Sequence, residues 1–324
     1  MSDELKSQRS TPGSGLQAVL ITPAATRDRW LGALRDAGGP HRFLVPEEVT
    51  DAGVIDAAVV ANPPPRALEG YPRLRLVQSL WMGVEGLLAD ATLPAGVPVA
   101  RMVDPGMTRV MPETVLTHVL WAHRHMDEYA RAQAAGEWRP LPVVDAADRR
   151  VAVLGLGELG ARAALTLARH GFHVLGWSRT ARVLPGVACH AGPGALARVV
   201  EQADILVNLL PLTPGTRGVL NAERLAALPR GAVVVNLARA AHLPIPDLLD
   251  ALDTGHVRHA ILDVFDEEPL PGASALWRHP RITITPHVAA PSDPRTCVPV
   301  VLQNLDRVRD GLVPLHLVDR TAGY

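Results

Sequence analysis

Three charged residues lie where parallel strands would end. Arg239, Glu268 and His287 each follow a short apolar run of the kind that forms a buried strand. In an open parallel sheet, ligands collect outside the carboxyl ends of the strands, so these side chains can converge on one crevice. There a guanidinium suits planar oxygen pairs, an imidazolium can donate a proton, and a carboxylate can orient that imidazolium. Singly, each residue also has an ordinary explanation, as a solvated arginine, a surface ion pair or a core histidine.

A glycine-rich turn precedes these segments. Gly155, Gly157 and Gly160 form a GxGxxG motif between the strand-like run Val151–Leu154 and the helix-like run Ala161–Arg169. The first glycine permits the tight turn, the second lets the backbone approach a pyrophosphate, and the third lets helix and strand pack closely. The motif alone is a weak signal, but its position between a strand and a helix predicts a dinucleotide site.

The residues that end the next strand-like run indicate which dinucleotide binds. An NAD site usually has an acidic residue there, which accepts hydrogen bonds from the ribose hydroxyls. This chain has Ser178, Arg179 and Thr180 instead. Hydroxyls and a guanidinium can donate to a 2′-phosphate that a carboxylate would repel, so the sequence predicts NADP(H) as the preferred cofactor, with NAD(H) as the alternative.

Together these motifs resemble the D-isomer-specific 2-hydroxyacid dehydrogenase family, most closely its glyoxylate/hydroxypyruvate reductase A branch. The arginine, glutamate and histidine follow the glycine-rich turn in the family's order and at spacings similar to the family's. The resemblance extends from about Leu74 to Tyr324. The segments that carry it are Trp177-Ser178-Arg179-Thr180, Asn236-Leu237-Ala238-Arg239, Thr283-Ile284-Thr285-Pro286-His287-Val288-Ala289-Ala290 and Val318-Asp319-Arg320.

The resemblance implies a role for each of the three charged residues. Arg239 would bind the carboxylate and carbonyl of a 2-oxoacid, and His287 would donate the proton. Glu268 would orient the ring of His287 and favour its charged form. The expected enzyme is an NAD(P)-dependent oxidoreductase of CH–OH donors, which uses NADPH to reduce a small 2-oxoacid such as glyoxylate or hydroxypyruvate.

Further site residues are also implied by the resemblance. A loop at Met82, Gly83 and Val84 would bind the substrate carboxylate, and Trp138 would lie on an arm that reaches a neighbouring subunit of a homodimer. Ala240 stands where the family usually has glycine, which would strain the loop if that position required a positive φ. The predicted cofactor contacts are Gly155, Gly157, Glu158, Leu159, Gly160, Ser178, Arg179, Thr180, Leu210, Pro211, Thr216, Ala238 and Asp263.

The apolar runs predict an α/β protein with two doubly wound parallel-sheet domains. Residues 1–15 are expected to form a disordered lead-in, residues 16–108 and 291–324 a flavodoxin-like substrate domain, and residues 109–290 a Rossmann-type coenzyme domain. One long helix is expected at Met111–Ala135, with Pro112 in its first turn. An amphipathic helix at Cys297–Arg309 is expected to pack back on the first domain.

Composition excludes several other classes of protein. A net charge of −1 gives no excess of positive charge for binding nucleic acid. No apolar stretch is long enough for a membrane span. The two cysteines, Cys189 and Cys297, predict neither a disulfide framework nor a zinc site. The histidines of the long helix lack metal-ligand spacing, so no metal is expected. With no signal peptide in its polar N-terminus, the chain is expected to be cytoplasmic.

Two alternative functions stay open at this point. One is a reductase for larger 2-oxoacids, since Trp81 and Met82 could either narrow the substrate pocket or simply pack in the core. The other is a non-catalytic regulatory protein that senses NAD(P). A formate-dehydrogenase-like oxidation is disfavoured, because those relatives carry glutamine rather than glutamate beside the histidine.

Overall fold

The computed structural model describes residues 15–323 and divides into two compact units. Unit 1 comprises Met1–Pro105 and Ser292–Tyr324, and unit 2 comprises Gly106–Pro291. The expected disordered lead-in lies, apart from Gly15, outside the described residues. The functional roles that the sequence assigns to the two domains stay proposals.

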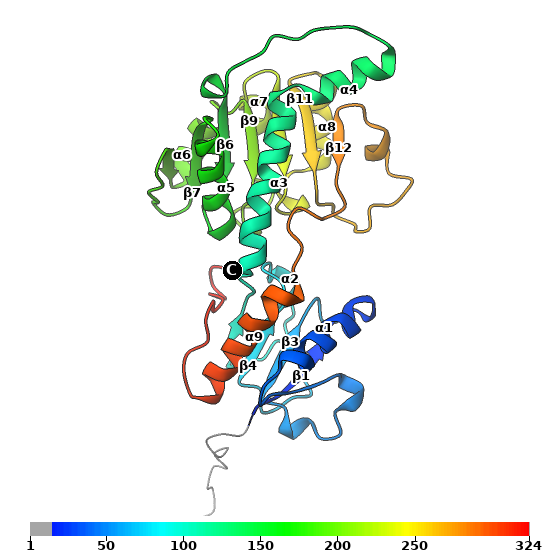
Figure 1. Cartoon of the computed structure of the whole chain (residues 1–324), viewed down its shortest axis with the longest axis vertical. Coiled ribbons are helices and arrows are strands. Elements are labelled where there is room, and N and C mark those ends of the chain that lie inside the picture. Colours follow the sequence, from blue (N-terminus) through cyan, green and yellow to red (C-terminus); the bar gives the residue numbers. More distant parts are fainter. Residues whose placement is uncertain (1–14, 324) are drawn as a thin grey trace, which may run out of the picture. The chain divides into compact units, whose positions relative to one another are not determined.

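Unit 1 is built on a five-stranded, wholly parallel sheet with the strand order β2-β1-β3-β4-β5 (Figure 1). This is the strand order of flavodoxin-like folds, as the sequence predicts. The elements of the unit are β1 (Gln17–Ile21), α1 (Ala24–Ala37), β2 (Arg42–Leu44), the 3-10 turns η1 (Pro46–Glu48) and η2 (Ala52–Val54), β3 (Ala57–Val60), β4 (Leu76–Ser79), α2 (Glu85–Leu88), β5 (Val99–Ala100) and α9 (Pro294–Arg309).

Alternate residues of the strands of unit 1 pack into two hydrophobic clusters, one on each face of the sheet. Leu20 packs in one cluster with Leu34 of α1 and Val301 of α9, whereas its neighbour Val19 packs in a second cluster on the opposite face. This alternation follows from the two-residue period of a strand. Full burial of a leucine or valine side chain contributes about 1.5–3 kcal/mol. Because Val301 of α9 lies in the first cluster, the expected packing of the C-terminal helix on the first domain is confirmed.

Unit 2 is built on a seven-stranded parallel sheet with the order β12-β11-β10-β9-β6-β7-β8. The elements of the unit are α3 (Pro105–His123), α4 (Met126–Ala135), η3 (Ala146–Asp148), β6 (Arg150–Leu154), α5 (Glu158–Arg169), β7 (His173–Ser178), β8 (Val187–Ala191), α6 (Pro193–Val200), β9 (Ile205–Asn208), α7 (Ala222–Ala227), β10 (Ala232–Asn236), η4 (Ala240–His242), α8 (Ile245–Asp253), β11 (Val257–Leu262), η5 (Ala275–Arg278) and β12 (Ile282–Ile284).

Helices cover both faces of this second sheet. Val153 of β6 packs with residues of α3 and α5, and α3 crosses that face in Figure 1. The next residue, Leu154, packs with residues of α6, α7 and α8 on the other face. The chain runs from β6 outward to β8 and then returns to β9 on the other side of β6. This reversal between β6 and β9 creates the crevice at which doubly wound sheets bind ligands.

The long helix is the clearest departure from the expected elements. It begins six residues earlier than expected, at Pro105, whose fixed φ suits a first helical position. Pro112 therefore lies inside the helix and not in its first turn. The helix also divides into α3 and α4, because His125 adopts a left-handed conformation with φ 57°. The prediction of one uninterrupted helix from Met111 was wrong.

Two edge strands were not expected from the sequence. β2 has three residues, too few to give a pattern. β8 is half-exposed and carries Cys189 and His190, so it lacks the apolar run by which the other strands are recognised. Within residues 15–323, none of the helices combines the length and apolar character that a membrane crossing requires.

Candidate functional site

His287 and Glu268 form a hydrogen-bonded pair in unit 2. The Nδ1 of His287 lies 2.6 Å from Oε2 of Glu268, and Oε1 of the same carboxylate accepts a hydrogen bond of 2.9 Å from the backbone N–H of Phe265. The glutamate is thus fixed at one oxygen while it contacts the imidazole with the other. The side chains of His287 and Glu268 are 51% and 35% exposed, so the pair opens to solvent. A carboxylate at Nδ1 leaves Nε2 as the ring nitrogen that can meet a substrate.

The backbone at His287 is held in an uncommon conformation. Its φ is 53°, in the left-handed region that few residues other than glycine adopt. Its N–H donates to the carbonyl of Asp263 at 2.9 Å and to that of Thr285 at 3.1 Å. Such conformations persist only where the surroundings enforce them, and they cluster at functional sites.

Asp263 accepts most of the hydrogen bonds that hold this segment in place. Its carboxylate is buried and accepts hydrogen bonds from the Thr285 hydroxyl at 2.6 Å, the Val288 N–H at 2.9 Å and the Ala289 N–H at 3.0 Å. The family resemblance predicts Asp263 as a cofactor contact. In the structure both of its oxygens hold the segment around His287. Burial lowers the pKa of His118 on α3, and the nearby Asp263 carboxylate partly opposes that shift.

Arg239 lies two strands from His287 along the same edge of the sheet. It follows β10, Asp263 follows β11, and His287 follows β12, and these three strands are consecutive neighbours in the sheet. Arg239 is half-buried, and its Nη1 donates to the carbonyl of Ala238 at 2.8 Å. The three predicted functional segments therefore follow the carboxyl ends of adjacent parallel strands.

Ala240 does not strain this loop. It is the first residue of η4 and is absent from the residues with positive φ in the described part of the chain. Glycine is therefore not required at this position, and the predicted cost of alanine does not arise.

The glycine-rich turn has the geometry that a dinucleotide needs. Gly155 has φ 97°, and a Cβ there would lie 2.6 Å from the carbonyl oxygen of Leu209. A Cβ on Gly160 would lie 1.7 Å from the carbonyl oxygen of Gly155, so only glycine lets α5 approach the turn this closely. By contrast, a Cβ on Gly157 would meet nothing within 4 Å in the described structure. The backbone at Gly157 is thus open to a ligand.

The first turn of α5 is suited to a phosphate. Gly157 is its N-cap, and no side chain among the described residues caps the helix there. The N–H groups at the start of a 12-residue helix, near Glu158 and Leu159, thus point outward at the positive end of the helix dipole. The chain therefore fits a dinucleotide phosphate at this turn.

Two groups of predicted cofactor residues lie on loops on either side of the glycine-rich turn. Ser178 ends β7, and its hydroxyl donates to the carbonyl of Thr180 at 2.7 Å, which shapes the turn that presents Arg179 to solvent. Leu210 and Pro211 follow β9, and the Thr216 hydroxyl donates to the Pro211 carbonyl at 2.7 Å. β7 and β9 flank β6 on its two sides, so both loops lie beside the glycine-rich turn.

The predicted substrate loop belongs to unit 1. Met82 and Gly83 are half-buried and Val84 is buried, in a segment that follows β4 and leads into α2. Trp81 packs edge-to-face against Trp30 with ring centroids 6.1 Å apart, and it contacts the core of the unit. Core packing therefore explains Trp81.

Trp138 lies on an exposed segment after α4 and is itself 98% exposed. The segment is attached to α4 at two points. Arg139 donates to Glu128 at 3.2 Å, and the N–H of Leu141 donates to the Tyr129 hydroxyl at 3.1 Å. The tryptophan is therefore presented outward from an anchored segment.

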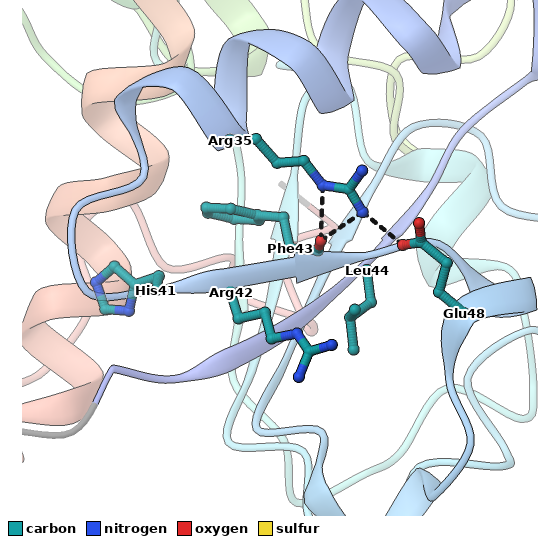
Figure 2. Close-up of a pocket in the computed structure, with 6 residues that line it drawn as sticks. All are labelled: Arg35, His41, Arg42, Phe43, Leu44 and Glu48. Atoms are coloured by element: carbon teal, nitrogen blue, oxygen red, sulfur yellow. Dashed lines mark hydrogen bonds and ion pairs between the residues drawn. The ribbon is translucent and has the colours of Figure 1, made fainter.

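A hollow of about 420 Å³ at β2 in unit 1 is lined by none of these residues (Figure 2). In the close-up, Arg35 donates twice to the carbonyl of Phe43 and pairs with Glu48. The Nδ1 of His41 accepts from the Leu16 N–H, and its Nε2 lies 3.1 Å from Asp306. Because these polar groups serve the fold of unit 1, we assign no chemistry to this hollow.

Sequence reasoning missed three buried polar residues of unit 2, Asn208, Asn236 and His242. Asn208 contacts both of the others, Asn236 contacts the carbonyl of Arg239, and His242 contacts the carbonyl of Pro211. The two asparagines end apolar strands, and an amide at the end of a buried strand is a signal that could have been read from the sequence. His242 gave no such signal.

Comparison with known proteins identifies the class of this fold and site. Residues 116–289 match the family model described as D-isomer specific 2-hydroxyacid dehydrogenase, NAD binding domain. The chain belongs to this family, and the predicted class of NAD(P)-dependent oxidoreductase is confirmed.

Individual relatives agree over nearly the whole chain. Glyoxylate/hydroxypyruvate reductase A of Serratia proteamaculans is 42% identical over 314 residues, which are 95% of this chain and 100% of the relative. A D-isomer specific 2-hydroxyacid dehydrogenase of Xanthobacter autotrophicus Py2, solved with NADPH and MES, has a TM-score of 0.91 and 42% identity and covers 96% of this chain and 100% of its own. An NADPH-dependent glyoxylate/hydroxypyruvate reductase of Sinorhizobium meliloti, solved with NADP and sulfate, has a TM-score of 0.89 and 36% identity, with 95% and 100% covered.

Proposed function

We propose that this protein uses NADPH to reduce a small 2-oxoacid, of the glyoxylate or hydroxypyruvate type, to the 2-hydroxyacid. The observation that carries the proposal is the pair formed by His287 and Glu268, 2.6 Å apart, at the carboxyl edge of a sheet that also presents Arg239. The names and bound cofactors of the relatives support the choice of substrate and nucleotide.

The residues of the chain account for the steps other than hydride transfer. When bound, the nicotinamide supplies the hydride. Arg239 binds the substrate carboxylate and polarises the adjacent carbonyl, because a guanidinium fork matches planar oxygens. His287 donates its Nε2 proton to the nascent alkoxide, and Glu268 stabilises the imidazolium from the Nδ1 side. General-acid catalysis of this kind contributes about 10²–10⁴-fold to the rate.

The loop after β7 selects the nucleotide. Arg179 and Thr180 donate hydrogen bonds to the 2′-phosphate of NADPH, and Ser178 does so once its hydroxyl rotates away from the Thr180 carbonyl. The segment contains no carboxylate that would repel the phosphate. The first turn of α5 binds the pyrophosphate through backbone N–H groups. The role of Met82, Gly83 and Val84 of unit 1 in substrate binding stays a prediction from the family resemblance.

We further propose that the protein is a homodimer in the cytoplasm. The dimer is supported by Trp138, which is almost wholly exposed, and by exposed apolar side chains on α3 and α4. These include Trp121, Met126 and Tyr129. Exposed aromatic groups on one region of a surface are typical of protein contacts. Sedimentation of the full chain at the mass of a monomer would contradict the dimer.

Steady-state kinetics test the reaction. NADPH consumption is measured at 340 nm with glyoxylate, hydroxypyruvate and a series of larger 2-oxoacids, and NADH is compared with NADPH. We expect the highest kcat/KM for the small substrates with NADPH, and His287→Ala to lose nearly all turnover while it still binds NADPH. Tight NADPH binding without turnover of any 2-oxoacid would instead favour a nucleotide-sensing protein. Near-normal rates in His287→Ala would remove the histidine from its role as proton donor.

A further inference from the structure

Three buried polar side chains form a closed hydrogen-bond network beneath the site in unit 2. Asn208 ends β9, Asn236 ends β10, and His242 lies in η4. Their exposed fractions are 0%, 1% and 0%. Burial of polar groups is costly unless each is hydrogen-bonded, so a buried trio of this kind requires an explanation.

Asn208 is the centre of the network. Its Nδ2 donates to Oδ1 of Asn236 at 3.0 Å and lies 2.9 Å from Nδ1 of His242. Its Oδ1 accepts from the backbone N–H of Leu210 at 3.2 Å. Because a backbone N–H can only donate, this last contact fixes which end of the amide is oxygen.

The protonation of His242 follows from that assignment. The amide nitrogen of Asn208 is a donor, so Nδ1 of His242 must be the acceptor. The ring proton therefore lies on Nε2, which donates to the carbonyl of Pro211 at 3.3 Å. His242 thus links Asn208 to the loop that follows β9.

Asn236 extends the network to the loop that follows β10. Its Oδ1 accepts from the N–H of Ala238 at 3.3 Å, and its Nδ2 donates to the carbonyl of Arg239 at 3.0 Å. That carbonyl also accepts from the backbone N–H of His242 at 3.3 Å. The backbone of Arg239 is therefore held by both the asparagine and the histidine.

We propose that His242 is a positioning residue, which acts with Asn208 and Asn236 to fix two loops of the site relative to each other. Its Nε2 holds the loop at Pro211, where the cofactor is proposed to bind. Its Nδ1, through the asparagines, holds the backbone of Arg239, which is proposed to bind the oxoacid. The inference rests on the proposed function. An apolar trio could fill the same space, but it could not bind these particular backbone atoms.

Three substitutions at His242 separate its two contacts. His242→Phe keeps an aromatic ring and loses both hydrogen bonds. An asparagine side chain can replace only the Nδ1 acceptor, and a glutamine side chain is long enough to replace the Nε2 donor. His123→Phe is the matched control, because His123 is also a buried histidine of unit 2 and lies outside the proposed site.

The experiment measures KM for glyoxylate and, by fluorescence titration, Kd for NADPH in the full-length variants. We expect His242→Phe to raise both about tenfold, the effect of one lost hydrogen bond on each loop. His242→Asn should restore KM but not Kd, and His242→Gln should restore Kd but not KM. His123→Phe should leave both constants within twofold of the wild type.

Several results would overturn the proposal. One is a folded His242→Phe variant with both constants within twofold of the wild type. Another is an equal change of both constants in His123→Phe, which would indicate general destabilisation. If His242→Phe does not fold, wild-type constants in both His242→Asn and His242→Gln would overturn it. A wild-type protein without 2-oxoacid turnover refutes the proposed function instead, while Kd for NADPH still tests the Pro211 contact.

Discussion

Replacement of Glu268 by glutamine tests the histidine–carboxylate pair with little change of shape. The amide oxygen can still accept from the Phe265 N–H, which now lies 2.9 Å from Oε1. The amide nitrogen would then face Nδ1 of His287 in place of the carboxylate oxygen at 2.6 Å. Since an amide N–H can only donate, the ring could meet it only as an acceptor, as a neutral imidazole.

The size of the effect follows from the exposure of the pair. A hydrogen bond to a charged group is worth about 1.5–3 kcal/mol when it is shielded from water. Here the two side chains are 51% and 35% exposed, so solvent screening places the value at the lower end. A loss of about 1.4 kcal/mol of transition-state stabilisation lowers kcat about tenfold. Removal of the imidazole itself should cost more, about 10²–10⁴-fold.

The assay is kcat for glyoxylate under saturating NADPH, measured from pH 5 to pH 9 for the wild type, Glu268→Gln and Glu267→Gln. Glu267 is the matched control, because it is the adjacent exposed glutamate. We expect kcat of Glu268→Gln to fall about tenfold and Glu267→Gln to match the wild type. Equal kcat values in the two variants would refute the assignment of Glu268 as the partner of the proton donor.

Three further predictions concern the cofactor turn and the stability of unit 2. Gly160→Ala places a Cβ 1.7 Å from the Gly155 carbonyl oxygen and should raise Kd for NADPH more than tenfold; an unchanged Kd in a titration would contradict this. Arg179→Ala should raise Kd for NADPH about tenfold and leave Kd for NADH unchanged. Equal increases in the two Kd values would argue against a contact with the 2′-phosphate. Burial lowers the pKa of His259 to about 4, although Asp127 lies 3.8 Å away. The unfolded chain therefore binds more protons below pH 6.5, and stability falls as pH drops from 6.5 towards 4. Between pH 7.5 and pH 5, His259 should lower the free energy of unfolding by about 2 kcal/mol. His259→Gln should therefore reduce the fall in melting temperature over this pH range by roughly 4–8 °C. A fall equal to that of the wild type would contradict the lowered pKa of His259.

Much of the fold could be predicted because its signals are local. Buried parallel strands appear as uninterrupted apolar runs, and the predicted run Val151–Leu154 matches β6 to within a residue. The failures have physical reasons. The edge strand β8 is half-exposed and lacks such a run, and the break at His125 depends on a backbone conformation that residue types do not specify.

The site shows the same division between local and long-range information. Motif order was sufficient to select His287 and Glu268, because the chemistry requires those residue types. It could not indicate that Asp263 holds the segment of His287 by three hydrogen bonds, since these join residues 22–26 positions apart in sequence. Nor could it connect Asn208 to His242, 34 positions away.

These long-range contacts hold His287 and Arg239, the two residues proposed to act on the substrate, in different ways. His287, the proposed proton donor, has a positive φ and lies between residues whose hydroxyl and N–H groups donate to the buried Asp263 carboxylate. Arg239 is held through its backbone carbonyl by a neutral amide and imidazole network. The Asp263 carboxylate thus holds the segment that carries the imidazole, whereas the Asn208 network holds the backbone that carries the guanidinium. A substitution in the Asn208 network should therefore raise KM for the oxoacid, and a substitution of Asp263 should lower kcat.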